Sequence, residues 1–69
     1  MSDLDDRLLA AHAAGDQWGL VSLYAEAADQ ANSVDAACFF LTQAYIYGLE
    51  LAHPSVPALH ARLDAEGRV

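Results

Sequence analysis

This 69-residue sequence predicts an all-α fold of four helices, and three features of its composition support that prediction. Apolar residues make up 55% of the chain, which is too hydrophobic for a disordered segment. Alanine, the best helix former, is the most common residue with 15 copies. Strand-forming β-branched residues are scarce, with four Val, one Ile and one Thr. We therefore expect residues 1–69 to form a single small α-helical domain.

The first helix is expected over about residues 3–14. Ser2 is a good N-cap, and Asp5 follows it at the spacing of a short capping box. The acidic side chains of this first turn lie where the helix dipole favours anions. Gly15 then supplies the left-handed residue that commonly ends a helix.

The second helix is expected over about residues 17–30, with Asp16 as its N-cap. Its apolar face is wide for a helix at the surface of a protein. One stripe of this face contains Trp18, Val21, Tyr24 and Ala28, and Leu20, Leu23 and Ala27 lie beside it.

The third helix is expected over about residues 34–52, with Asn32 or Ser33 as its cap. The segment His53-Pro54 ends it, because the residue before a proline disfavours helical backbone. A helix that is apolar on nearly every side is typically central and buried. One side carries Val34, Ala37, Cys38, Leu41, Tyr45 and Gly48, while Phe39, Phe40, Ile46 and Tyr47 project elsewhere.

The fourth helix is expected over about residues 56–66, with Ser55 as its cap. Pro57 is tolerated because it falls in the first turn, and Gly67 marks the end. The last two residues of the chain are expected to fray. Because every loop is short, neighbouring helices should run antiparallel and form two helical hairpins.

Both predicted hairpins carry a recurrent spacing of apolar, small and aromatic residues. It appears as Cys38-x2-Leu41-Thr42-x2-Tyr45 followed by Leu59-x3-Leu63, and as the turn Gly15-Asp16 followed by Leu20-x3-Tyr24-x2-Ala27. These segments resemble tetratricopeptide repeats, which are helix-turn-helix units of 34 residues. Cys38 stands where that pattern has tryptophan, and Thr42 stands where it has glycine.

The resemblance allows two registers. In one register each predicted hairpin is a repeat, and Leu59 follows Leu20 by 39 residues instead of 34, which is an insertion of five. In the other register Leu41-x3-Tyr45-x2-Gly48 lies on the second helix of a repeat, and residues 49–54 form its exit.

The resemblance implies a scaffold that binds peptides or proteins on a concave face, built largely by the first helix of each pair. Carried over by position, this face includes Asp5, Leu9 and His12 from the first helix and Phe39, Gln43 and Ile46 from the third. The family's clamp for a peptide carboxylate is not implied, because this chain lacks the Lys, Arg and Asn that the clamp requires.

A repeat array normally needs about three units to share a continuous core, so two units leave apolar surface uncovered. Phe39, Phe40, Ile46 and Tyr47 are therefore expected at an interface. The alternative is that the other three helices wrap the third helix completely and these side chains form core.

Charge restricts the partners of the chain. Ten acidic residues face three arginines and no lysine, for a formal net charge of −7. This balance excludes binding to nucleic acid and attraction to anionic membranes, both of which require clustered basic residues. The acidity either keeps an apolar chain in solution or presents a docking face to a basic partner.

Neither a membrane span nor a secretion signal is expected. The longest weakly polar run, residues 36–49, is shorter than the roughly 20 residues that cross a bilayer. The first seven residues are acidic where a signal peptide is basic. A cytoplasmic location is the resulting expectation.

Catalytic, metal and cofactor sites are not expected. His12, His53, His60 and Cys38 show no spacing that presets metal ligands, and no basic residue within helical reach of Cys38 would activate its thiol. The paired aspartates belong to exposed helix ends, whereas acid–base catalysis requires a carboxyl group in a dry pocket. We therefore do not expect an enzyme.

The leading hypothesis is a small protein–protein interaction module, an adaptor or a regulatory accessory protein. It would bind another protein or peptide, a basic one being one option, through the third helix and part of the first. The alternative is a structural homodimer that completes its core by self-association and has no separate ligand. A bundle that binds metal or a cofactor through its histidines is a third hypothesis, ranked below both.

Overall fold

The computed structural model describes residues 2–69 and confirms an all-helical fold, with no strand in that range. Its elements are α1 (Asp3–Ala14), α2 (Gln17–Asp29), α3 (Val34–Leu51) and α4 (Val56–Ala65). The helix α1 has the expected bounds, whereas α2, α3 and α4 each end one residue before the expected position.

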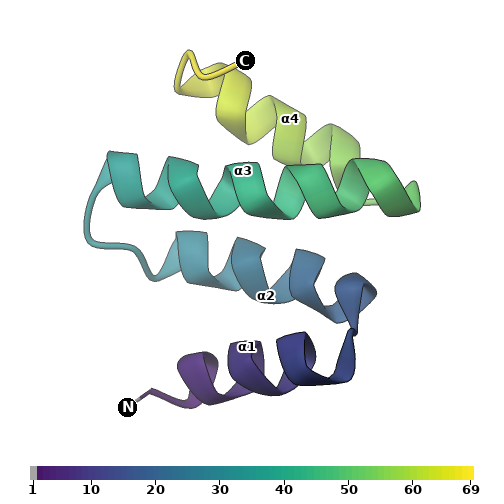
Figure 1. The fold of residues 1–69 in the computed structure, drawn as a ribbon. Coiled ribbons are helices and arrows are strands. Elements are labelled where there is room, and N and C mark those ends of the chain that lie inside the picture. Colours follow the sequence, from purple (N-terminus) through teal and green to yellow (C-terminus); the bar gives the residue numbers. More distant parts are fainter. Residues whose placement is uncertain (1) are drawn as a thin grey trace.

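The four helices lie side by side in chain order and form a plate (Figure 1). The backbone extends over 32 × 28 × 12 Å. A second layer of helices would require about 13–15 Å in the short direction, since packed helix axes are 8–10 Å apart and each backbone cylinder is about 5 Å wide. The plate is therefore one helix thick, and no helix covers either of its broad faces.

Packing of α3 against α2 provides most of the core. The helix α4 packs on the other side of α3, and α1 packs on the other side of α2. Small side chains lie at the centre of the α2–α3 contact, where Val21 and Ala44 are fully buried. The buried cluster consists of Val21, Ala28, Cys38, Leu41, Ala44, Leu59 and Leu63.

Gly48 lets three helices meet at one end of this core. A Cβ atom at Gly48 would lie 2.8 Å from the Val56 Cγ2 atom and 3.9 Å from the Val21 Cγ1 atom. Real Cβ atoms do not approach other carbons as closely as 2.8 Å, so a larger residue would push α4 away from α3. Glycine is therefore required here by contact and not by backbone conformation.

Three of the expected N-caps are confirmed. The Ser2 hydroxyl accepts the Asp5 backbone N–H, the Asp16 carboxylate accepts that of Gly19, and the Ser33 hydroxyl accepts that of Ala36. Each bond satisfies one of the donors that a helix N-terminus leaves free. Between the two candidates for α3, the structure selects Ser33.

The expected cap of α4 by Ser55 is wrong. Ser55 occupies the N-cap position but makes no capping bond from its side chain. Its backbone N–H and its hydroxyl both point to the His53 Nδ1 atom, at 3.1 and 2.8 Å. The hydroxyl is therefore used within the α3–α4 loop and is not available to α4.

The helix ends use left-handed residues at three places. Gly15 (φ 68°) follows α1 and Gly67 (φ 69°) follows α4, as the sequence predicts. After α3 the same role falls to Ala52 (φ 53°), whose left-handed backbone lets the His53 N–H donate to the Gly48 carbonyl at 2.9 Å. Such a cap ends the helix one residue before the expected position.

Arg68, which is expected to fray, has two partners in the structure. Its backbone N–H donates to the Leu63 carbonyl at 2.9 Å, and its guanidinium pairs with Asp35 at 2.6 Å. The residue therefore ties the C-terminal end of the chain to the start of α3.

The alternative in which the other three helices wrap α3 completely is wrong as well. The helix is central in the plate, but Phe39 is 59% exposed, Ile46 is 47% exposed and Leu49 is 53% exposed. Neighbours cover a helix in a one-layer plate along two sides only, so the apolar residues on a third side remain at the surface.

Replacing Ala52 by Gly should raise the free energy of unfolding by about 0.5–1 kcal/mol, because left-handed backbone costs alanine about 1–2 kcal/mol and the gain is partly offset in the unfolded chain. Urea unfolding followed by circular dichroism measures the change. The control is Ala61→Gly at an exposed position inside α4, which should lower stability by about 1 kcal/mol. A loss in Ala52→Gly similar to that in Ala61→Gly would contradict the left-handed cap.

Candidate partner-binding face

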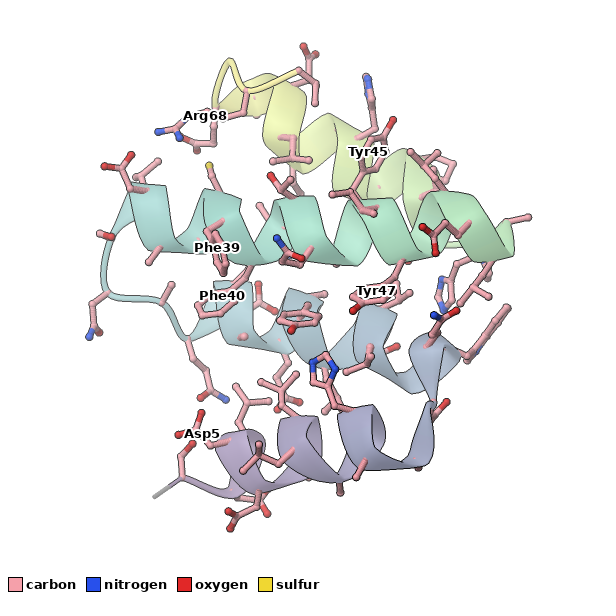
Figure 2. The ribbon with its side chains drawn as sticks, in the orientation of Figure 1. Asp5, Phe39, Phe40, Tyr45, Tyr47 and Arg68 are labelled. Carbon is pink, nitrogen blue, oxygen red and sulfur yellow. The ribbon has the colours of Figure 1, made fainter. Side chains whose placement is uncertain are left out.

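One broad face of the plate carries the residues that the sequence assigns to partner binding, and we call it the front face. Figure 2 shows Phe39, Phe40 and Tyr47 on the side of α3 turned toward the viewer. Within each helix, positions three, four and seven residues apart share one side, which groups Gln43 and Ile46 with Phe39, and Leu9 and His12 with Asp5. The hydrogen bond between His12 and Tyr24 and the hollow lined by Asp5 and Phe40 place the α1 group on the same face as the α3 group. We define the front face by Asp5, Leu9 and His12 of α1, Tyr24 of α2, and Phe39, Phe40, Gln43, Ile46, Tyr47 and Glu50 of α3.

An aromatic cluster centred on Tyr24 links three helices across this face. The Tyr24 ring is stacked against Phe40 and Tyr47, with ring centroids 6.2 and 6.0 Å away. Phe39 meets the Phe40 ring edge-on at 5.5 Å. The His12 Nε2 atom lies 2.9 Å from the Tyr24 hydroxyl oxygen, so a hydrogen bond joins α1 to the cluster. These contacts hold the aromatic side chains in place before any partner arrives.

An exposed stripe runs along α3 beside this cluster. Phe39, Gln43, Ile46 and Glu50 follow one another at intervals of three or four residues, so they line one side of the helix. Phe39 and Ile46 expose about half of their surface, and Gln43 is half-buried. The stripe thus carries two exposed apolar side chains, with Gln43 between them and the Glu50 carboxylate at its end, along three turns of α3.

A hollow of about 470 Å³ lies between the N-terminal end of α1 and the start of α3. Asp5 and Phe40 both line it, from opposite helices. Its remaining lining comes mainly from small or aliphatic side chains, including those of Leu4, Leu8, Ala27, Ala31 and Ala36. Leu9 and His12 lie further along α1 and outside this lining, and Leu9 is 61% exposed.

The opposite face has a smaller hollow of about 230 Å³ between α3 and α4. Val34 and Cys38 line it together with the charged side chains of Arg62 and Glu66. Arg62 is held there by its bond to Asp29 of α2, at 2.7 Å. Trp18 is exposed elsewhere and packs on His53, with ring centroids 4.3 Å apart.

All three arginines are engaged in ion pairs within residues 2–69. Arg7 pairs with Asp3 at 3.0 Å and with Glu26 of α2, Arg62 pairs with Asp29, and Arg68 pairs with Asp35. The hydrogen bond that Arg7 donates to the Glu26 carboxylate raises the pKa of Arg7, and the one that Arg68 donates to Asp35 raises the pKa of Arg68. Six acids form no ion pair with another described side chain: Asp5, Asp6, Asp16, Glu50, Asp64 and Glu66. The electrostatic potential at the surface is therefore negative, and none of the arginines in residues 2–69 is free of an ion pair.

The histidines and the cysteine each have a local environment. His12 bonds to Tyr24, His53 accepts from Ser55, and His60 packs near the Tyr45 ring at 5.8 Å. Cys38 is a buried free thiol. Within residues 2–69, no three His, Cys, Asp or Glu side chains come together as a metal site would require. None of the helices in this range is both long and apolar enough to cross a membrane.

Tyr24 is the functional candidate that sequence reasoning missed. Its position in the sequence places it on the apolar side of α2. Helical spacing alone does not show whether a residue on that side lies in the core or at the edge of the surface. Only the pairing of α2 with α3 shows that its ring is half-buried under Phe40 and Tyr47.

Comparisons with known proteins return no match: no family model, no curated protein and no solved structure is similar to this chain. The residues of the front face are therefore the basis for any functional assignment.

The stability of the protein should fall as pH rises above about 10, and it should fall less in Tyr24→Phe. Burial in the cluster, and secondarily the nearby Tyr47, raises the pKa of Tyr24. The folded protein then retains the phenol proton at a pH where the unfolded chain loses it, so stability decreases from the unfolded pKa up to the folded one. Urea unfolding at about pH 8 and pH 11 measures the effect. An equal loss in both proteins would show that Tyr24 is not protected by the cluster.

Proposed function

We propose that this protein is a small protein–protein interaction module, an adaptor or accessory protein, that binds a partner segment on its front face. The observation that carries the proposal is the exposed apolar stripe of α3 beside the ordered cluster of Tyr24, Phe40 and Tyr47. Exposed apolar side chains that gather on one face of a small protein favour an interaction site there.

The preformed character of the face supports the same proposal. The stacked rings and the bond between His12 and Tyr24 restrict side chains that would otherwise lose rotamer freedom on binding. A surface that is already ordered loses less entropy when a partner binds.

The tetratricopeptide-like arrangement is part of this proposal. In that interpretation α1 and α2 form one helical hairpin and α3 and α4 form the second. The first helix of each pair supplies most of the binding face, and Tyr24 of α2 lies between them. The reversal of the chain between consecutive helices supports this interpretation (Figure 1), as does the shared hollow lined by Asp5 of α1 and Phe40 of α3.

A homodimer through the same face is the competing proposal, and the exposed stripe favours it equally. One observation weighs against it: pairing two chains of charge −7 would add electrostatic repulsion.

Ile46→Asp should remove most of the apolar-dye binding of the front face while lowering stability by less than about 1 kcal/mol, because Ile46 is half exposed. Nile red is a suitable probe, since an uncharged dye is not repelled by the acidic surface. Fluorescence titration and circular dichroism give the two measurements.

The matched control is Val34→Asp. Val34 is 53% exposed but lies at the start of α3, where an acidic side chain suits the helix dipole, and it borders the opposite hollow. Dye binding should be unchanged in this variant. Loss of helix content in Ile46→Asp alone would mean that the stripe is core, and would contradict the proposal. A mass that doubles over about a hundredfold concentration range would favour the homodimer.

A further inference from the structure

We infer that the partner presents a cationic amphipathic helix, whose apolar side chains cover the stripe of α3 and whose Lys or Arg side chains meet Glu50 and Asp5. This inference rests on the proposed function and specifies the chemistry of the partner. Three observations support it: the length of the stripe, the position of Glu50, and the absence of ion pairs to Glu50 and Asp5 among the described side chains.

The length of the stripe fits a helical partner. Glu50 lies eleven residues after Phe39 in α3, so the stripe of Phe39, Gln43, Ile46 and Glu50 is about 16 Å long along the helix axis. An amphipathic helix that binds in a groove uses anchors at positions i, i+3, i+4 and i+7, which cover about 10 Å. Two or three apolar anchors of such a helix therefore fit between Phe39 and Ile46, and a basic residue one turn further reaches Glu50.

Glu50 is placed where a cation is missing. It lies in the last turn of α3, where the helix dipole is negative, and this turn contains no basic residue. A carboxylate at this end is unfavourable because its charge and the helix terminus have the same sign. A Lys or Arg of the partner would neutralise the Glu50 carboxylate and interact favourably with the C-terminal end of α3. Binding therefore adds an interaction that the free protein lacks.

The other end of the face is acidic too. Asp5 lines the hollow opposite Phe40 and forms no ion pair with another described side chain (Figure 2). With Glu50, it places carboxylates at two separated positions of the front face. The arginines that could neutralise them are held by Glu26, Asp29 and Asp35.

This charge pattern selects among the occupants of the face. A second copy of the chain would bring further carboxylates to the apolar stripe, and an acidic peptide would be repelled in the same way. A basic amphipathic helix would cover the exposed apolar side chains and pair with the carboxylates of Glu50 and Asp5. Electrostatic attraction would also increase its rate of association with the front face.

The test uses two synthetic helical peptides of about 18 residues, both with Leu at positions i, i+3, i+4 and i+7. The remaining positions are Lys in one peptide and Gln in the other. Calorimetric titration at physiological ionic strength, where charges beyond about 8 Å are screened, gives the affinity for the intact protein and its variants.

The Leu–Lys peptide should bind more tightly than the Leu–Gln peptide. Ile46→Ser should weaken its binding about tenfold or more, and Glu50→Gln should weaken it about two- to fivefold. The matched controls are Val34→Ser and Glu66→Gln, which change the same kinds of group at the opposite hollow and should leave affinity unchanged. In the free protein, Glu50→Gln should raise the melting temperature, which also verifies that the variant folds.

Each other result overturns a distinct statement. If both peptides bind with equal affinity and Ile46→Ser weakens that binding, the inference of a cationic partner is overturned and the proposed function is retained. Binding that is insensitive to Ile46→Ser would overturn both. Equal weakening of peptide binding by Glu50→Gln and Glu66→Gln would show that the peptide is attracted by overall charge, and would overturn the specific role of Glu50. A dimer that forms as the protein concentration rises would show that a second copy of the chain occupies the front face.

Discussion

The contact between α2 and α3 is the interaction on which the rest of this structure depends. Small residues, among them Ala28, Ala44 and Gly48, lie in this contact, and Val21 is fully buried between the two helices. The helices α1 and α4 each add to one side of this pair. Without the central contact neither outer helix would have a surface to pack on, since isolated helices of 10 to 12 residues are not stable in water.

The one-layer arrangement has a direct consequence for the surface. A central helix in a plate is covered on two sides, and α3 is apolar on more than two sides. Its additional apolar residues are divided between an aromatic cluster, which packs with Tyr24 of α2, and the exposed pair Phe39 and Ile46. The fold thus orders part of the apolar excess and leaves the other part free for a partner.

The arginines connect segments that are distant in the chain. Arg7 joins α1 to α2, while Arg62 and Arg68 each bind an aspartate 33 residues earlier in the chain. Exposed ion pairs contribute little to stability, so their effect is chiefly to orient the outer elements on the central pair. They also leave Asp5 and Glu50 without an internal counter-ion in the described chain, and this gives the front face its acidic character.

The sequence by itself determined the all-α class, the position of each helix and three of the four N-caps. These features depend on hydrogen bonds and spacings within a few residues, as at Ser2, Asp16 and Ser33. It also grouped the predicted contact residues of α1 and α3, because helical periodicity alone decides which side chains share a side of a helix. The tertiary structure decided the remainder: the use of Ser55 by His53, the ion pair that holds Arg68, the place of Tyr24 in the cluster, and the side of α3 that stays open. Each of these depends on how the helices and their connections are positioned relative to one another, which no local pattern of residues specifies.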